Sequence, residues 1–248
     1  MIHQVTTIEE GVQRLFLAGE RPGISFTYHR ASEHELFDTL EVNGACVPVL
    51  KWRYYPKHYT MRENRKHSII SELGRLSTLK SLDFAPNSET MAQLLCRELD
   101  LAEFFLDAKI HSIMGYGNEK AANFIVHLKN DTMMSLEAFV TLPSEAIRES
   151  KHTLFTTNGM MTDLAADKVL VQELVHVFSA GKHPVSYTDH DVCLFGLSMD
   201  DQDVCYACYA LIDGKEDSAA WKEQSERLRI LSEAALNTLK TGKKYLAD

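Results

Sequence analysis

The sequence lacks three features that would assign it to a large class of proteins. No apolar run approaches the roughly 20 residues that a membrane-spanning helix needs, so no membrane is expected as a partner. No block of lysine and arginine stands out in a chain of net charge −9, which argues against nucleic acid as a partner. The N-terminus, Met1-Ile2-His3-Gln4, lacks a basic region followed by an apolar one, so no signal peptide is expected.

The sequence contains few cysteines, and their number is odd. The five cysteines and the missing signal favour reduced thiols and a cytoplasmic location. Cys205-Tyr206-Ala207-Cys208 is a C-x-x-C, and Cys193 and His190 are near it in sequence, so a zinc or redox site is imaginable. Neither the further ligands at a suitable spacing nor the context of a redox motif is visible. We therefore favour structural thiols, and we predict no metal site.

The stretch from Ser88 to Leu142 organises the chain. Apolar residues at helical spacing between Met91 and Phe105 predict a helix. Three strand-like runs follow, and a polar Asn/Asp turn joins the last two; the runs are Lys109–Met114, Asn123–Leu128 and Met133–Val140. A helix followed by an antiparallel meander indicates an α+β fold, with one open, mainly antiparallel sheet and helices on one face.

The remaining segments give weaker signals. Helical patterns cover Ala31–Leu40, Met61–Leu73, Asp167–Ser179 and Ser218–Thr241. Strand patterns cover Cys46–Tyr55, which Pro56 ends, together with Leu76–Phe84 and His152–Thr157.

Several short phrases resemble the C-terminal domain of the glucose–fructose oxidoreductase / inositol dehydrogenase (Gfo/Idh/MocA) family. They occur in the family's order from about Val47 to the C-terminus, and each is weakly specific alone. The phrases are Trp52-Arg53-Tyr54-Tyr55-Pro56, Glu72-Leu73-Gly74-Arg75-Leu76, Cys96-Arg97-Glu98-Leu99-Asp100-Leu101, Phe178-Ser179-Ala180-Gly181-Lys182-His183-Pro184-Val185-Ser186 and Thr241-Gly242-Lys243-Lys244-Tyr245. The resemblance implies a sheet that packs against a nucleotide-binding domain and often against a second subunit. We accordingly predict an N-terminal extension over residues 1–46 and an oxidoreductase C-terminal-like domain over residues 47–248.

The resemblance also implies a Rossmann domain, which does not fit into the first 46 residues, because one βαβ unit alone takes about 30. No G-x-G-x-x-G occurs, since Gly115-Tyr116-Gly117 lacks the third glycine. The family's Glu-Lys-Pro is absent as well. The sequence therefore predicts no cofactor of its own, with NAD or NADP supplied only through a partner's nucleotide domain.

The family's catalytic histidine is also missing. By the resemblance, this acid/base group precedes an aspartate by three residues and follows another by four, positions that Arg97, Asp100 and Gln93 occupy here. An arginine is no general base near neutral pH, because its pKa exceeds about 12. No catalytic residue is therefore assigned.

A vestigial ligand site is predicted instead, formed by Arg97, Gln93, Asp100, Arg53 and Tyr54, for a small polar or sugar-like ligand. The basic cluster that runs from Lys51 to His67 could steer an anionic ligand or partner, although such a cluster is usually a solvated helix face. The cluster is Lys51, Arg53, Lys57, Arg62, Arg65, Lys66 and His67.

Three functional hypotheses remain open. The first is a non-catalytic ligand-binding or oligomerisation subunit related to sugar and cyclitol dehydrogenases. The second is an active NAD(P)-dependent oxidoreductase that uses a partner chain's nucleotide domain. The third is a purely structural or regulatory dimer. The open sheet face needs a cover, because large exposed apolar patches are rare on monomers, and a homodimer or a family oxidoreductase subunit would supply it.

Overall fold

The computed structural model describes residues 4–20, 24–32, 35–67, 73–164, 173–188, 194 and 196–247. The chain divides into two compact units. Unit 1 comprises residues 1–56 and 190–227, and unit 2 comprises residues 57–189 and 228–248. This division describes packing, and the predicted domains 1–46 and 47–248 stay a prediction.

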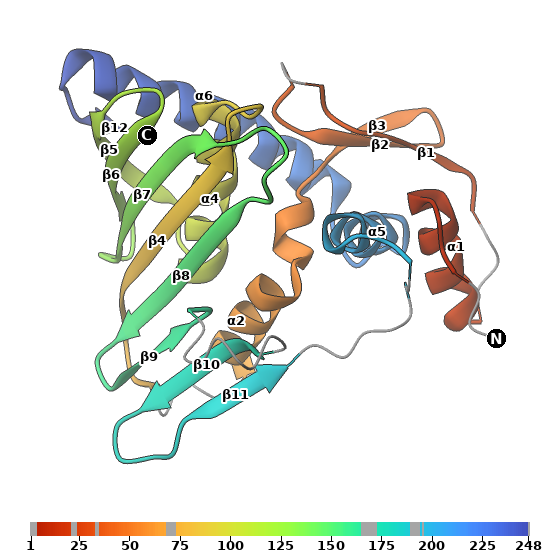
Figure 1. Ribbon diagram of the computed structural model, residues 1–248, viewed down its shortest axis with the longest axis horizontal. Helices are drawn as coiled ribbons and strands as arrows, with labels where there is room; N and C mark the ends of the chain where they lie inside the picture. Colours follow the sequence, from red (N-terminus) through yellow and green to blue (C-terminus); the bar gives the residue numbers. More distant parts are fainter. Residues whose placement is uncertain are drawn as a thin grey trace. The chain divides into compact units, whose positions relative to one another are not determined.

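Unit 1 contains a three-stranded antiparallel sheet in the order β1-β2-β3 (Figure 1). Its elements are α1 (Ile8–Ala18), β1 (Phe26–His29), β2 (Asp38–Val42), β3 (Ala45–Val49), the 3₁₀ helix η1 (Lys51–Tyr54), α5 (Met199–Ile212) and the first part of α6 (Ser218–Thr241). Thr7 caps α1 by accepting a hydrogen bond from the Glu10 backbone N–H. Cys205 on α5 packs so closely on Gly11 of α1 that a Cβ there would lie 2.6 Å from its sulfur.

Unit 2 contains a nine-stranded sheet in the order β11-β10-β9-β8-β4-β7-β6-β5-β12 (Figure 1). The strands are β4 (Leu76–Pro86), β5 (Ile110–Gly117), β6 (Ala121–Leu128), β7 (Met133–Leu142), β8 (Glu149–Thr156), β9 (Gly159–Thr162), β10 (Glu173–Ser179), β11 (Val185–Thr188) and β12 (Tyr245–Leu246). All neighbouring strands pair antiparallel except β4 and β7, which run parallel. The predicted α+β class and the mainly antiparallel sheet are therefore confirmed.

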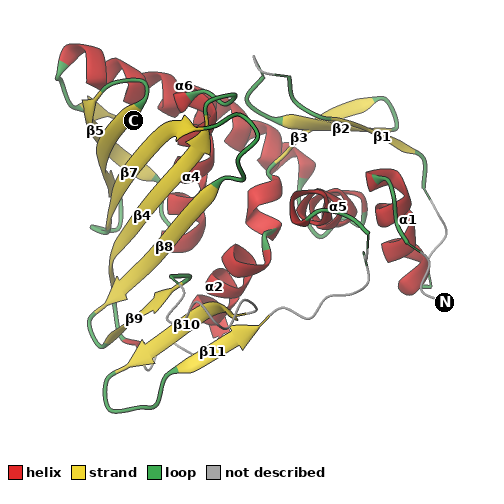
Figure 2. Ribbon diagram, viewed as in Figure 1, coloured by secondary structure: helices red, strands yellow, loops and turns green. Residues whose placement is uncertain are grey.

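The helices of unit 2 lie on one side of this sheet (Figure 2). They are α2 (Pro56–His67), α4 (Met91–Leu106) and the later part of α6. Thr90 and Gln93 form a capping box that begins α4, and Asp107 ends it in a left-handed conformation at φ 53°. Helix α4 packs against β4 and β7, whose buried positions alternate along each strand.

Several local predictions were wrong. Residues 173–179 form strand β10 instead of a helix, because the chain pairs on both sides: Val177 lies opposite Met161 of β9 and opposite Val185 of β11. The start of that predicted helix lies outside the described residues. Strand β3 ends at Val49, and Pro56 begins helix α2 instead of ending a strand. A proline suits the first helical position, where its missing N–H is not needed.

Two further predictions need correction. The predicted helix over Ala31–Leu40 is wrong where it reaches Asp38, since residues 38–42 form strand β2, held by β1 and β3. The predicted helix over Met61–Leu73 begins earlier, at Pro56, and is described as far as His67. Among the described residues, no helix is long and apolar enough to cross a membrane.

Candidate functional site

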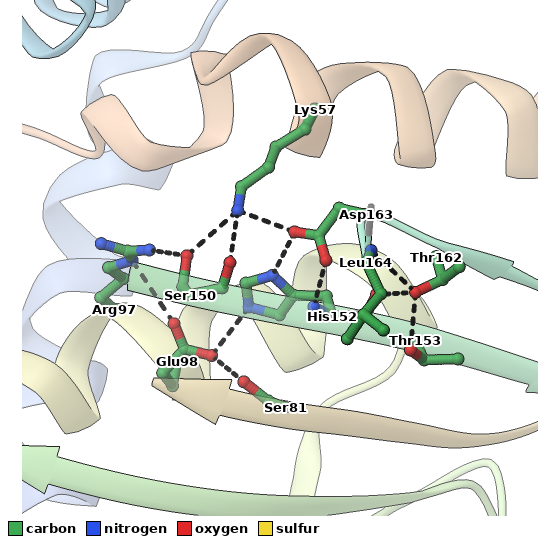
Figure 3. A network of polar contacts seen from close by, with 10 residues as sticks. All are labelled: Lys57, Ser81, Arg97, Glu98, Ser150, His152, Thr153, Thr162, Asp163 and Leu164. Carbon is green, nitrogen blue, oxygen red and sulfur yellow. Dashed lines mark hydrogen bonds and ion pairs between the residues drawn. The ribbon is translucent and has the colours of Figure 1, made fainter. Parts of the chain in front are cut away.

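A network of charged and polar side chains lies inside unit 2, between α2, α4 and the sheet (Figure 3). Strand register explains part of it, because Ser81 of β4 pairs with His152 of β8, and Asp83 pairs with Ser150. All four are buried, on positions that face the helices. The alternation of the two strands therefore turns polar side chains into the interior, where each needs a partner.

His152 stands at the centre of this network. Its Nε2 lies 3.0 Å from Oε2 of Glu98 on α4, and its Nδ1 lies 3.2 Å from Oδ2 of Asp163, directly after β9. Its backbone N–H also donates to Asp163. Ser81 donates a hydrogen bond to Glu98 across 2.5 Å. The imidazole thus bridges two carboxylates from separate elements.

Lys57 extends the network to the first turn of α2. Its ammonium lies 2.7 Å from Oδ2 of Asp163 and donates to the carbonyl oxygen of Ser150 at 2.7 Å. Arg97 reaches the same serine from α4, with Nη2 2.7 Å from Oγ, and its Nε lies 3.4 Å from Oε1 of Glu98. One strand, two helices and the segment after β9 are therefore tied together by charge-assisted hydrogen bonds.

Burial and pairing compete in setting the pKa values here. Burial by itself would lower the pKa of His152, but Glu98 and Asp163 outweigh it and raise the pKa to about 8. Burial opposes ionisation of Asp163 and Glu98, yet the neighbouring cations hold the pKa of both carboxyl groups well below its ordinary value. We infer that His152 is an imidazolium and that both carboxyl groups are ionised at neutral pH.

A third carboxyl group nearby behaves differently. Burial raises the pKa of Asp83 to about 6, against the opposing effect of Arg97 and Arg148. Arg148 lies 3.7 Å from Asp83 and also contacts Glu89. Asp83 is therefore the carboxyl group of this region that is most readily protonated near neutral pH.

The network offers one set of atoms with the composition of a metal site. His58, His152 and Asp163 each present a ligand atom, and these atoms lie within 4.8 Å of one another. Three protein ligands are the number found at catalytic zinc sites. However, the Lys57 ammonium already contacts Oδ2 of Asp163, the oxygen that also lies beside His152 Nδ1, and Arg97 adds a further positive charge. A dication would have to enter beside these charges, so we assign the cluster as an ion-pair network.

The arrangement is better suited to holding the fold than to catalysis. A general acid or base must come within hydrogen-bond reach of its substrate. The side chains of His152 and Glu98 have no exposed surface, and that of Asp163 has none either. These groups therefore join α2, α4 and β8, and we assign them no reacting atom.

The structure places the predicted ligand residues in different surroundings. Gln93 accepts hydrogen bonds from Thr90 in the capping box of α4. Arg97 joins the buried network, and Asp100 is fully buried on the same helix. The structure thus gathers Gln93, Arg97 and Asp100 on α4, within unit 2.

The other two predicted ligand residues belong to unit 1. The Tyr54 hydroxyl donates to Glu216 at 3.0 Å, and the Arg53 guanidinium lies 5.9 Å from the centroid of the Trp221 ring. Trp221 itself donates to Glu216 at 3.2 Å. Both residues therefore have packing partners inside their own unit, and the shared ligand site stays a prediction.

The two-glycine motif of β5 has a structural explanation. A Cβ at Gly115 would lie 2.6 Å from the Phe124 ring, and one at Gly117, where φ is +128°, would lie 2.3 Å from the Ala121 carbonyl oxygen. Both glycines permit the close approach of β5 to β6. They form no phosphate-binding loop before a helix.

Sequence reasoning did not identify Lys57, Glu98, Ser150, His152 and Asp163 as one group. A signal was present in β8, where Ser150 and His152 share a face with the buried Leu154. Polar residues at core-facing positions of a strand indicate a buried polar network. The partners come from elements that are distant in sequence, so their identity required the structure.

Comparison with known proteins supports the fold. No protein-family model matches the sequence, and no curated protein matches it. The structure has the fold of solved sugar and cyclitol dehydrogenases of the Gfo/Idh/MocA type. This similarity establishes the dehydrogenase-like fold.

Three solved structures illustrate the similarity. A myo-inositol dehydrogenase from Corynebacterium glutamicum has a TM-score of 0.56 at 15% identity, over 80% of this chain and 63% of that one. An oxidoreductase domain protein from Kribbella flavida has a TM-score of 0.58 at 10% identity, over 80% and 64%. Levoglucosan dehydrogenase, solved with NADH and levoglucosan, has a TM-score of 0.59 at 11% identity, over 79% and 64%. The chain therefore spans less than two thirds of the length of these proteins.

Proposed function

We propose that this chain is a non-catalytic subunit with a dehydrogenase-like fold, which binds a small polar ligand and assembles through its open sheet face. The observation that carries this proposal is the state of Arg97. By the family resemblance, this residue stands where a catalytic histidine would act as acid/base. Here its guanidinium contacts Glu98 and Ser150, and the nearest histidine of this network, His152, is buried between two carboxylates.

Titration calorimetry with NADH and NADPH tests the lack of catalysis. We expect no binding up to millimolar concentration, and no reduction of NAD⁺ or NADP⁺ when myo-inositol or levoglucosan is supplied. Arg97→His, which introduces the histidine that the family resemblance places here, should not create activity. Arg97→Lys is the control, because it changes the same residue but keeps the positive charge. Micromolar binding of NADH, or turnover by Arg97→His, would instead support an oxidoreductase that binds its cofactor without the glycine fingerprint.

Assembly is supported by the outward face of the sheet in unit 2. Phe84 of β4 and Phe139 of β7 stack with their ring centroids 4.8 Å apart, on positions that point away from the buried side. Phe155 of β8 is 40% exposed. Aromatic residues are enriched at protein interfaces, and a second copy of the same face would bury them.

Light scattering on the purified chain tests this part. We expect a mass twice the 28.1 kDa of one chain. Phe139→Glu should give the monomer, because it places a charge in the centre of the proposed contact. Ile147→Glu is the matched control, since Ile147 is 87% exposed between β7 and β8 and lies outside the strands. A monomeric wild-type chain would contradict the homodimer.

Ligand binding is tested separately by thermal unfolding with a panel of sugars, polyols and sugar acids. A ligand that binds the folded state raises the unfolding temperature by mass action. We expect at least one member of the panel to do so. No shift with any member would favour the purely structural or regulatory dimer.

A further inference from the structure

A cavity of about 400 Å³ opens in unit 2 where β4 begins and β8 ends. Its volume lies within the range of small-molecule sites. It is distinct from the Arg97 region, because Ser150 and Thr156 are six residues apart on β8, which corresponds to roughly 20 Å. The residues that line it are Arg65, Leu73, Gly74, Arg75, Leu76, Asn130, Thr132, Leu154, Thr156 and Met161.

One wall of this cavity is fixed by backbone contacts. Gly74 has a φ of +77°, and a Cβ there would lie 2.1 Å from Oγ1 of Thr157. The backbone N–H of Arg75 donates to that Oγ1 at 3.1 Å, and the N–H of Thr157 donates to the Arg75 carbonyl at 3.0 Å. The backbone that carries Arg75 is therefore held against the β8–β9 turn before any ligand arrives.

The opposite side is also organised. Thr132 is buried and donates to the side chain of Asn130, which in turn donates to the Leu106 carbonyl at 3.0 Å. These contacts fix two polar lining side chains of the β6–β7 turn. The lining of the cavity therefore combines the polar side chains of Asn130 and Thr132 with the apolar side chains of Leu154 and Met161.

The charge of the cavity is unlike that of the whole protein. Among the described residues that line it are two arginines and no acidic residue, in a chain of net charge −9. The Arg65 side chain is 13% exposed, and it pairs with Asp107, which is 80% exposed, through Nη2 at 3.1 Å. Within the described part of the chain, its buried Nε has no hydrogen-bond partner. A buried N–H group that makes no hydrogen bond costs free energy, and a ligand that brings an acceptor oxygen would remove this cost.

We propose that this cavity binds a small organic anion, in which a carboxylate or phosphate group contacts Arg65 and Arg75 and a compact body packs on Leu154 and Met161. Guanidinium groups match both anions because their N–H donors form a planar fork. Asn130 and Thr132 add neutral polar groups to the lining. The site does not depend on catalysis or on the Arg97 region.

Calorimetry with glucose 6-phosphate, gluconate and glucose tests the site and separates the two anion types. We expect one of the two anions to bind with one molecule per chain and sub-millimolar affinity, and we expect neutral glucose to bind far more weakly. Arg65→Gln and Arg75→Gln should each weaken binding by about tenfold or more, as expected for the loss of a charge-assisted hydrogen bond. Arg75 is exposed, so its replacement leaves the fold intact.

Arg62→Gln is the matched control. It removes the same charge from the same helix, but Arg62 lies over the Phe104 ring, with its guanidinium carbon 4.4 Å from the centroid, and does not line the cavity. We expect it to leave the affinity within about twofold, since only long-range attraction is lost. The proposal is overturned if neither anion binds at millimolar concentration, or if Arg62→Gln weakens binding as much as the two cavity variants do.

Discussion

The imidazole of His152 and the carboxylate of Glu98 meet across 3.0 Å, and neither side chain has any exposed surface. Both are charged by our assignment, and Asp163 and Lys57 complete the arrangement on the other side of the ring. Charges that are buried away from water stabilise one another, so removing one of them leaves the others without a compensating charge.

Replacing the central residue should strongly destabilise the fold. We expect His152→Gln to lower the free energy of unfolding by about 3 kcal/mol or more, since it leaves two buried carboxylates short of a counter-charge. Urea denaturation measures the loss. His127→Gln, an identical change at an exposed position of β6, should stay within about 0.5 kcal/mol of wild type. Equal losses of unfolding free energy in the two variants would mean that the buried carboxylates do not need the charge of His152.

Stability should also fall with rising pH in a defined window. The pKa of His152 is raised from 6.5 to about 8, so its contribution is complete below 6.5 and is lost as the pH rises through 8. The size of the shift corresponds to about 2 kcal/mol. The urea midpoint measured between pH 6 and pH 9, at roughly unit intervals, should decline in wild type and stay nearly flat in His152→Gln.

On the acid side the carboxyl groups act in opposite directions. Glu98 and Asp163 have lowered pKa values, so their contributions are present above the ordinary carboxyl range and are lost as the pH falls through the folded-state values. Asp83, with a pKa near 6, costs stability as it ionises between 3.8 and 6. A wild-type chain that is more stable at pH 8 than at pH 6 would contradict the raised pKa of His152.

Two glycines with the same backbone conformation should respond differently to alanine. Gly181 has a φ of +73°, and a Cβ at this position would meet no atom within 4 Å, so Gly181→Ala should cost about 1 kcal/mol, from the left-handed conformation alone. Gly74, at φ +77°, adds a clash with Thr157, so Gly74→Ala should cost about 3 kcal/mol or more. Thermal unfolding compares the two, and a Gly74→Ala variant no worse than Gly181→Ala would show that the turn can relax.

Thiol reactivity should separate the C-x-x-C from Cys46. Burial raises the pKa of Cys205 to about 12 and raises that of Cys208 as well, whereas Cys46 on β3 is exposed. The thiolate is the reactive form, so the two buried cysteines should be inert in the folded protein. With a thiol-specific reagent, Cys46→Ser should remove one equivalent of the fast phase, and Cys208→Ser should remove none. Loss of fast-reacting thiol in Cys208→Ser would indicate a reactive motif.

The sequence predicted those parts of the fold whose signals are local. Helix α4 and strands β5 to β7 follow one another with clear periodicity and a polar turn, and the structure confirms them. Strand β10 was missed because Leu174, Val177 and Phe178 also fit helical spacing, and its pairing with β9 and β11 decides the outcome. The parallel pairing of β4 with β7 had no local signal.

The candidate sites show the same division. Arg97 was singled out by a family phrase, and the structure gives it partners on β8 that no phrase contains. Arg65 was one of seven basic residues that usually form a solvated face, and its place at a cavity depends on β4, β8 and the β6–β7 turn. Sequence spacing could suggest which residues carry charge, but the helix–sheet packing decides which charges meet.

The position of β4 in the sheet has a consequence for how the chain folds. Hairpins β5–β6 and β6–β7 close over short segments, so they can form early, whereas Leu79 of β4 must wait for Met134 on one side and Leu154 on the other. On a ribosome, β4 emerges long before either neighbour, so both of its edges are unpaired until β7 is synthesised, and one edge stays unpaired until β8 follows. We therefore expect the slow step of folding to be the insertion of β4, and nascent chains that stall before β8 to be the species most prone to aggregate.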